Sequence, residues 1–384
     1  MKQEVSYLKR LLSALLAALL CLSLAACNRS EESQPEEPTP QQTQEEPEQT
    51  PAEPEEVPAE EPEVEQPWTW PTDTPENQGI SQSALESIHS PIDSFPLLSS
   101  MIIKNGYLVD TYFKEGYDET SMFVLNSASK SVTSALIGIA IDQGHIESVD
   151  VPISNYFPQV LQKEDPAWQQ ITIRHLLTHT SGIQTTDEAL WEQWRNADNW
   201  VDYILAQPIV ATPGEVFSYS TGNTHLLSAI LEQATGMTLY DYGKQYLFDP
   251  VGMDSVRIDT DPQGIGDGGN GIWMTTSDMA KFGQLFLNEG QWEGQQVVPA
   301  SWVEESTSLQ YQRNTGSADY GYQWWVRTFG AQDYDAFFAQ GHAGQYIFVV
   351  PQLQLVVAFT SDYTGATSIY WQLVNDIVAA CDAV

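Results

Sequence analysis

One segment constrains the fold of this chain more than any other: the run from Ser127 to Ile141 has no polar face. Its residues are apolar or small except for Lys130, so the segment predicts a buried helix. Burying an unpaired ammonium group costs several kcal/mol or makes the group give up its proton. The spacing of three residues places Lys130 on the same helix face as Ser127, and an amine of lowered pKa beside a serine hydroxyl can generate an alkoxide nucleophile. The alternative is a lysine that reaches the surface and a serine that only caps the helix.

The N-terminus has the pattern of a bacterial lipoprotein signal. Lys2, Lys9 and Arg10 precede an apolar run that ends in Leu24-Ala25-Ala26-Cys27, which is typical of a signal peptide with a lipobox. We therefore expect residues 1–27 to be a signal and Cys27 to carry the lipid, so that the protein is extracytoplasmic and anchored to the cell membrane. A simple cleaved signal or a membrane-spanning helix is the alternative, although the run is short for a span.

The next segment predicts an extended tether over residues 28–70. Between Glu31 and Glu65 it holds fourteen glutamates and no lysine or arginine, together with many prolines and glutamines. Such a composition cannot bury a core and repels itself, so we expect a disordered spacer without chemistry of its own.

Charge and cysteine content exclude several classes of partner. From Gln66 onward the chain carries about 26 net negative charges, which argues against nucleic acids because these require basic patches. The three cysteines lie in the signal, at the lipid site and near the C-terminus (Cys21, Cys27 and Cys381), so no disulfide within the mature chain is expected. We also predict no metal site and no cofactor, and the sequence makes no prediction of oligomeric state.

The pattern of elements predicts an α+β fold. Strands are expected at both ends of the domain, and helical signals broken by Pro and Gly fill residues from about 145 to 265. We expect one antiparallel sheet flanked by helices, with this mainly helical region inserted. The expected elements are a hairpin at Ser99–Phe113 turning at Lys104-Asn105-Gly106, helical stretches at Ile173–Leu177 and Thr224–Leu231, strands at Tyr346–Val350 and Leu353–Phe359, and a helix at Thr367–Ala380.

Two further motifs supply partners for Ser127, because the G-x-S-x-G elbow of many hydrolases is absent. The segment Val216–Asn223 follows Pro213-Gly214 and precedes a helix, which places Tyr219 in a loop at a helix start. The segment Gly341–Gln345 directly precedes a strand, and its glycines let the backbone approach a substrate closely.

With these motifs, the chain resembles the serine β-lactamase and penicillin-binding-protein-like superfamily. Within it the chain is similar to the class C-like branch of esterases, D-aminopeptidases and 6-aminohexanoate-oligomer hydrolases. Leu176–Gly182 and Gly271–Met279 match as well, and the resemblance runs from about Pro71 to the C-terminus. It implies a β-lactamase/transpeptidase-like domain at residues 71–384.

The resemblance implies a role for each matching residue. Ser127 would be acylated, and Lys130 would be its proton acceptor or electrostatic partner. Tyr219 would act as general base and acid, so the resemblance leaves open which of the two takes the proton. The backbone N–H groups of Ser127 and Gln345 would form the oxyanion hole, and Gly344 and Gln345 would contact substrate. His342 stands where many relatives carry the lysine of K-T-G.

Two departures from the family pattern affect substrate choice. Thr221 replaces the asparagine of Y-x-N, so the amide that orients the acyl group is missing or supplied differently, with Asn223 as the candidate. A histidine at position 342 removes a fixed positive charge, because a histidine without a charged partner is mostly neutral at pH 7. Substrates bearing a carboxylate would lose an ion pair there unless Arg313 or Arg327 replaces it.

The remaining histidines and tryptophans have mainly structural interpretations. His175 and His179 have the spacing of a metal pair without a third ligand, so we expect structural histidines, and His225 is either packing or a second layer of the site. Five tryptophans are interpreted as core, with a cleft wall as the alternative: Trp191, Trp194, Trp273, Trp324 and Trp325.

The resulting functional hypothesis is a lipid-anchored serine hydrolase that cleaves a small ester, amide or peptide through an acyl-enzyme on Ser127. One alternative is a β-lactamase or D,D-carboxypeptidase acting on cell-wall peptides. The other is a non-catalytic penicillin-binding or sensor module that uses the same cleft.

Overall fold

The computed structural model describes residues 68–86 and 97–382. The expected signal peptide, Cys27 and most of the expected tether lie outside the described residues. Trp68 and Trp70, which the expected boundary places in the tether, pack instead against Trp292 with ring centroids 5.0 and 6.4 Å from it. The Trp70 indole also donates to Ser277 Oγ at 3.0 Å. Both tryptophans are therefore part of the packed domain.

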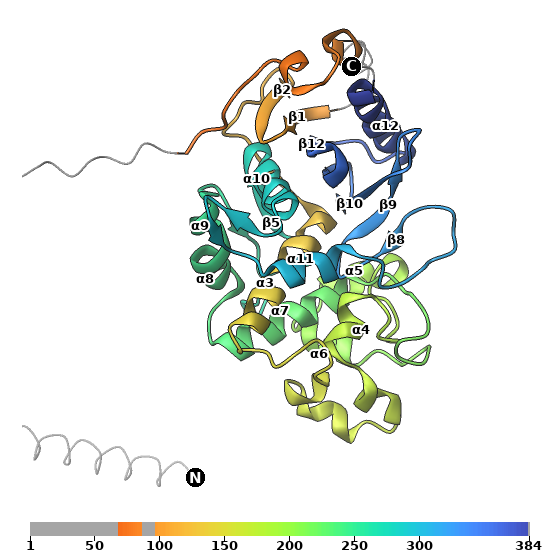
Figure 1. Cartoon of the computed structure of the whole chain (residues 1–384). Helices are drawn as coiled ribbons and strands as arrows, with labels where there is room; N and C mark the ends of the chain where they lie inside the picture. The colour runs from red at the N-terminus through yellow and green to blue at the C-terminus, as the bar shows by residue number, and fades with distance from the viewer. Residues whose placement is uncertain (1–67, 87–96, 383–384) are drawn as a thin grey trace, which may run out of the picture. The chain divides into compact units, whose positions relative to one another are not determined.

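A seven-stranded antiparallel sheet is the larger layer of the domain (Figure 1). Its central strands come from both ends of the domain, as expected, because β1 pairs with the C-terminal strand β12. In order across the sheet the strands are β2 (Tyr107–Phe113), β1 (Leu97–Lys104), β12 (Leu355–Ser361), β11 (Gln345–Val350), β10 (Tyr334–Gly341), β9 (Trp325–Phe329) and β8 (Asp319–Tyr320).

Local sequence explains the hairpin that starts the sheet. Lys104 pairs with Tyr107, so Asn105 and Gly106 form a two-residue turn. Both have positive φ, 52° and 81°, which is the geometry of the type I′ turn that Asn-Gly favours. The predicted hairpin is therefore confirmed, and its first strand begins two residues earlier than expected.

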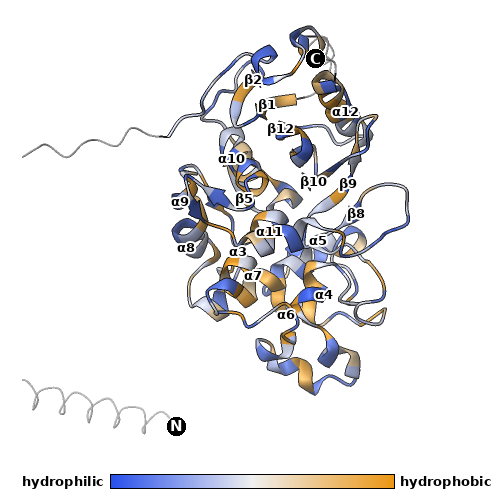
Figure 2. Ribbon diagram, viewed as in Figure 1, coloured by the Kyte–Doolittle hydropathy of each residue, from blue (hydrophilic) through white to orange (hydrophobic). Residues whose placement is uncertain are grey.

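Both faces of the sheet are covered, which explains why its central strands are almost continuously apolar. Along β12, Val356 and Ala358 enter one hydrophobic core, whereas Val357 and Phe359 enter another. Helix α10 (Thr276–Leu287) lies over the first face, and α12 (Ser368–Asp382) supplies most of the helical residues of the second core. Figure 2 shows apolar residues along these strands between the two helices.

In the sequence, helices dominate between the N-terminal and C-terminal strands of the sheet, in agreement with the helical region expected at about 145–265. A second, three-stranded sheet has the order β3-β5-β4, and a short hairpin joins β6 and β7. The remaining elements are β3 (Met122–Val124), α3 (Ser129–Asp142), α4 (Ile173–Leu177), α5 (Trp191–Arg195), α6 (Trp200–Leu205), α7 (Thr221–Thr235), α8 (Leu239–Gly243), α9 (Asp249–Val251), β4 (Arg257–Ile258), β5 (Ile272–Thr275), β6 (Gln291–Trp292), β7 (Gln295–Gln296) and α11 (Ala300–Thr307).

Helix α3 is the buried helix that the sequence predicts. Twelve of its residues, from Ser129 to Ala140, are buried, and α7, α11 and β10 pack around it. The turn that precedes it, η2 (Asn126–Ala128), is a 3₁₀ helix, so Ser127 lies two residues before the start of the α-helix rather than inside it. Lys130 has 1% of its surface exposed, which excludes a lysine that extends to solvent.

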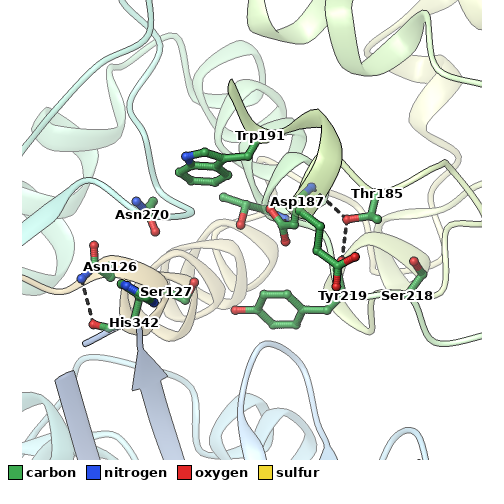
Figure 3. A pocket seen from close by; sticks show the side chains of 11 residues that line it. Asn126, Ser127, Thr185, Asp187, Trp191, Ser218, Tyr219, Asn270 and His342 are labelled. Atoms are coloured by element: carbon green, nitrogen blue, oxygen red, sulfur yellow. Dashed lines mark hydrogen bonds between the residues drawn. The ribbon is translucent and has the colours of Figure 1, made fainter. Parts of the chain in front are cut away.

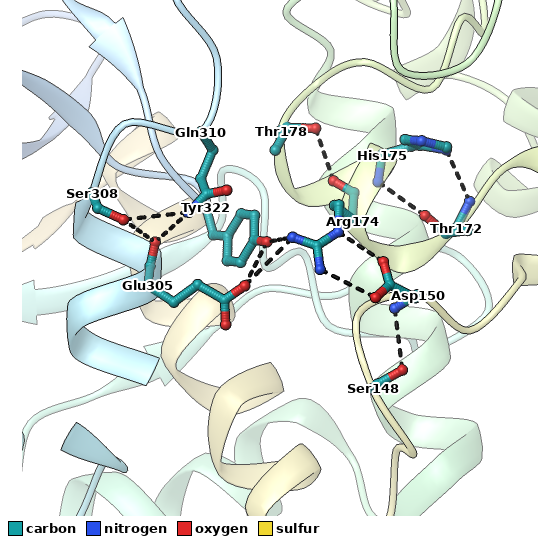
Figure 4. A network of polar contacts seen from close by, with 10 residues as sticks. All are labelled: Ser148, Asp150, Thr172, Arg174, His175, Thr178, Glu305, Ser308, Gln310 and Tyr322. Carbon is teal, nitrogen blue, oxygen red and sulfur yellow. Dashed lines mark hydrogen bonds and ion pairs between the residues drawn. The ribbon is translucent and has the colours of Figure 1, made fainter. Parts of the chain in front are cut away.

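A polar network joins the helical region to α11 (Figure 4). Arg174 of α4 makes a two-pronged ion pair with Asp150, with N–O distances of 2.7 and 3.2 Å. It also contacts Tyr322 and lies 3.4 Å from Glu305 of α11. His175 caps α4, because its Nδ1 accepts the N–H of Thr172 at 3.2 Å. This network holds the start of the segment Leu176–Gly182.

None of the helices among the described residues is both long and apolar enough to cross a membrane.

Candidate active site

The ammonium group of Lys130 is the centre of the site. Its Nζ lies 3.0 Å from Ser127 Oγ, as the spacing of the two residues predicts. Burial lowers the pKa of Lys130 from 10.5 to about 8, although the negative charges of Asp187 and Asp267 oppose this. At neutral pH a fraction of the lysine is therefore a neutral amine next to the serine hydroxyl, which is the arrangement that activates a serine.

Two more acceptors hold Lys130 in place. Its Nζ donates to Thr221 Oγ1 at 3.1 Å and to the carbonyl oxygen of Gly269 at 2.8 Å. Thr221 stands where the family motif has asparagine, and its hydroxyl supplies a side-chain oxygen to the lysine. With Ser127, these contacts satisfy all three protons of the ammonium group.

Tyr219 approaches Ser127 from the loop before α7. Figure 3 shows its hydroxyl pointing toward Ser127. Its ring packs against His179 at 4.5 Å and stacks on Trp325 at 5.9 Å, so its position is defined on two sides. Burial raises the pKa of Tyr219 well above its usual value, and the phenol is therefore protonated at neutral pH.

His179 is a buried neighbour of the site rather than half of a metal pair. It is fully buried, and burial together with Lys130 holds its pKa well below the usual value of a histidine, so the ring is neutral. His175, the other histidine with metal-pair spacing, caps helix α4. Among the described residues, no group of three or more His, Cys, Asp or Glu side chains could hold a metal ion.

Two cavities open on Ser127 and Tyr219. The larger, about 670 Å³, extends toward the helical region, where Trp191, Asp187 and Glu188 line its wall (Figure 3). The smaller, about 300 Å³, extends along the sheet side past Trp325. The larger is lined by Asn126, Ser127, Thr185, Asp187, Glu188, Trp191, Ser218, Tyr219, Thr221, Asn270 and His342.

The turn between β10 and β11 closes the other side of the nucleophile. His342 is exposed and lines both cavities, and its carbonyl oxygen accepts from Asn126 Nδ2 at 2.9 Å. Gly344 has φ of 94°, and a Cβ there would overlap the Tyr370 hydroxyl, so this position requires glycine. The Gln345 side chain is buried and donates to the Ser361 carbonyl at 2.7 Å.

Asn223 does not lie among the cavity-lining residues. It is buried in the first turn of α7, where its Oδ1 accepts from Ser181 Oγ at 3.0 Å. The amides that line the large cavity are those of Asn126 and Asn270, which sequence reasoning missed. Their only sequence signal is position: Asn126 directly precedes Ser127, and Asn270 directly precedes the Gly271–Met279 motif.

The two arginines considered as carboxylate partners do not line either cavity. The Arg313 guanidinium lies over the outer rings of Phe217 and Trp325, at 4.9 and 5.0 Å. Arg327 lies over Trp371 at 4.4 Å, beside α12. Among the described residues, no arginine or lysine lines either cavity, and His342 is the one histidine on their walls.

The five tryptophans divide between the cavity walls, the core and the surface outside the site. Trp191 and Trp325 line the cavities, whereas Trp194 and Trp324 are fully buried. Trp273 donates to Asp259 at 2.8 Å outside the site.

His225 lies in a second layer, away from both cavities. Its Nε2 is 3.0 Å from Asp261 Oδ2, and both side chains are fully buried.

Comparisons with known proteins identify the family of this chain. Residues 93–369 match the family model described as Beta-lactamase. The chain is 25% identical over 314 residues to the 6-aminohexanoate-dimer hydrolase of Paenarthrobacter ureafaciens, which covers 74% of this chain and 78% of that protein.

Solved structures share the fold. A candidate 6-aminohexanoate-dimer hydrolase from Bacillus anthracis matches with a TM-score of 0.70 at 22% identity, covering 82% of this chain and 87% of that one. A class C β-lactamase in complex with cefoxitin matches with a TM-score of 0.64 at 16% identity, covering 78% and 98%. The family match spans most of the described residues, and the chain therefore belongs to the Beta-lactamase family of serine hydrolases.

Proposed function

We propose that this protein hydrolyses a small ester or amide through an acyl-enzyme on Ser127. The observation that carries the proposal is the 3.0 Å contact between Ser127 Oγ and a fully buried lysine of lowered pKa, beside an open cavity. A non-catalytic binding module has no use for this contact, because burying an amine lowers stability and only a catalytic role would favour keeping it.

The pKa directions favour Lys130 as the group that accepts the serine proton. A neutral amine is present at pH 7 when the pKa is about 8, whereas Tyr219 remains a protonated phenol. Lys130 would take the proton as Ser127 attacks the carbonyl carbon, and Tyr219 would pass a proton to the leaving group. Water would then cleave the acyl-enzyme by the reverse path, and the backbone N–H groups of Ser127 and Gln345 would bind the oxyanion.

The cavity walls favour neutral or cationic substrates over anionic ones. Asp187 and Glu188 line the large cavity, and in the part of the chain that the structure describes no arginine or lysine lines either cavity. A carboxylate in this space would meet like charges without a cation to pair with. This favours neutral or cationic esters and amides over the β-lactam and D-Ala-D-Ala substrates of the rival assignment.

Replacement of the nucleophile tests the central proposal. Ser127→Ala should abolish hydrolysis of a short-chain nitrophenyl ester and labelling by a fluorophosphonate, with an unchanged melting temperature. Ser218→Ala is the matched control, because Ser218 lines the same cavity. This variant should still be labelled on Ser127. A label that maps to another serine, or substantial activity in Ser127→Ala, would contradict the assignment.

Proton transfer is tested by a pH profile. For the wild type, kcat/KM should rise with pH through about 8, because the neutral form of Lys130 increases as its proton is lost. Tyr219→Phe should keep this rise and lower kcat by about 10² or more, the usual scale of general acid–base catalysis. A profile already flat at pH 6, or a normal rate for Tyr219→Phe, would show that these residues do not move the protons.

Replacement of His342, at the rim of both cavities, tests the proposed substrate preference. His342→Lys should raise kcat/KM for a chromogenic cephalosporin relative to a neutral nitrophenyl ester. His342 is exposed, so solvent screens the new ion pair and we expect a gain of about fivefold, corresponding to about 1 kcal/mol. His342→Gln should give no gain. Efficient cephalosporin turnover by the wild type would favour the β-lactamase assignment instead.

We also propose that the protein is a lipoprotein held at the membrane through Cys27, which the Leu24–Cys27 lipobox supports. The native protein should fractionate with membranes and need detergent for release. Cys27→Ser should prevent incorporation of a labelled fatty acid. An intact, lipid-free wild-type protein in the medium would be inconsistent with this anchor.

A further inference from the structure

Two buried aspartates tie one loop of the site to two helices of the inserted region. We refer to residues 259–271 as the cradle loop. Near its start, Asp261 pairs with His225 of α7 at 3.0 Å. Near its end, Asp267 pairs with Arg195 of α5 at 2.6 Å, and the Asp267 side chain is 1% exposed. In the described part of the chain, Arg195 is the one cation within ion-pair distance of Asp267.

The segment next to Asp267 places a backbone carbonyl group in contact with Lys130. The carbonyl oxygen of Gly269, two residues further on, accepts from Lys130 Nζ at 2.8 Å. The carbonyl of Gly268 accepts from Thr133 of the same helix, also at 2.8 Å. The N–H of Gly271 donates back to the Asp267 carbonyl at 2.8 Å and closes a tight turn around these groups.

The cradle loop fits against α3 and α7 without spare room. A Cβ on Gly268 would overlap Thr133 and Ser228, and a Cβ on Gly269 would overlap Thr221. Displacing Asp267 would therefore move the Gly269 carbonyl, since the intervening residues have no space in which to absorb the shift.

Arg195 connects the cradle loop to the wall of the large cavity. Its guanidinium lies 4.0 Å from the ring of Trp200 and 5.4 Å from the ring of Trp191, which lines that cavity. The arginine is thus enclosed by aromatic faces on one side and by Asp267 on the other. This leaves it few conformations other than the one that forms the ion pair.

We propose that Asp267 and Arg195 are positioning residues, whose ion pair holds the Gly269 carbonyl against the ammonium group of Lys130. This inference rests on the proposed function, because it assigns the pair a role in activating Ser127. Neither residue lines the large cavity, so both act through Lys130 rather than on substrate.

The pair also affects the charge of Lys130. The negative charge of Asp267 raises the pKa of Lys130 against the effect of burial, and Asp187 acts in the same direction. The other titratable groups around the lysine are Tyr219, which is protonated, and His179, which is neutral. Removing either half of the ion pair therefore leaves an uncompensated charge of known sign near Lys130.

The test measures the rate of fluorophosphonate labelling of Ser127 as a function of pH in the full-length protein. Arg195→Gln leaves Asp267 unpaired, so the midpoint of the rise should move to higher pH, by about 0.5 unit or more. Asp267→Asn leaves Arg195 unpaired, so the midpoint should move to lower pH. Both variants should label more slowly at their plateaus, by about 10- to 100-fold, because the lysine is displaced.

Two further variants separate this role from simple stabilisation. Arg195→Lys keeps the charge and should keep the wild-type midpoint. Asp150→Asn breaks the ion pair with Arg174, away from both cavities next to Ser127, and should change neither midpoint nor plateau whatever its melting temperature. If Asp267→Asn does not fold, the midpoints and plateaus of Arg195→Gln and Arg195→Lys are compared instead, and only Arg195→Gln should differ from the wild type.

The outcomes distinguish the two proposals. Opposite shifts with slower labelling support the positioning role. Lower melting temperatures with unchanged midpoints and plateaus would show that the ion pair only stabilises the fold, and would overturn this inference while leaving the proposed function intact. A wild-type protein that is not labelled on Ser127 would overturn both.

Discussion

The buried ammonium group of Lys130 is the interaction on which the architecture of the site depends. A charge in the protein interior must be paired or hydrogen-bonded, and the three acceptors of this one come from separate parts of the chain. Ser127 belongs to the turn before the same helix, Thr221 begins α7, and Gly269 lies in the cradle loop. Satisfying the lysine therefore requires α7 and the cradle loop to pack on α3. The contact that we propose activates the serine thus also fixes how these segments lie relative to one another.

The sheet contributes the opposite wall of the site through close backbone packing. Gly341 ends β10 where a Cβ would overlap the carbonyl of Leu125, so strand and nucleophile turn meet without a side chain between them. The Asn126 amide then bonds the His342 carbonyl across this junction. Because the strand and the turn are held by backbone contacts, the distance between Ser127 and the start of β11 is set by the fold rather than by flexible side chains.

Two departures from the family pattern have different consequences in three dimensions. Thr221 is compatible with the lysine chemistry, because its hydroxyl reaches Lys130 where the family carries an amide. His342 is an exposed residue at the rim of the cavities, so under the proposed function we expect its identity to affect which substrates enter rather than how the serine is activated. The acidic Asp187 and Glu188 act in the same direction as the histidine, since both features leave an anionic substrate without a cationic partner.

The sequence by itself determined the buried helix, the Ser127–Lys130 pair, the Asn-Gly hairpin and the strands β11 and β12, because each depends on residues that are close together in the chain. It also indicated the position of Tyr219, through the turn residues before α7. Tertiary structure alone decided the rest of the site. Asn126 and Asn270 line the cavity and Asn223 does not, although nothing in their local sequence separates them, because exposure depends on which segments pack over each residue. The pairing of Arg195 with Asp267 joins residues far apart in the sequence, and ion pairs of this kind leave no periodic signal.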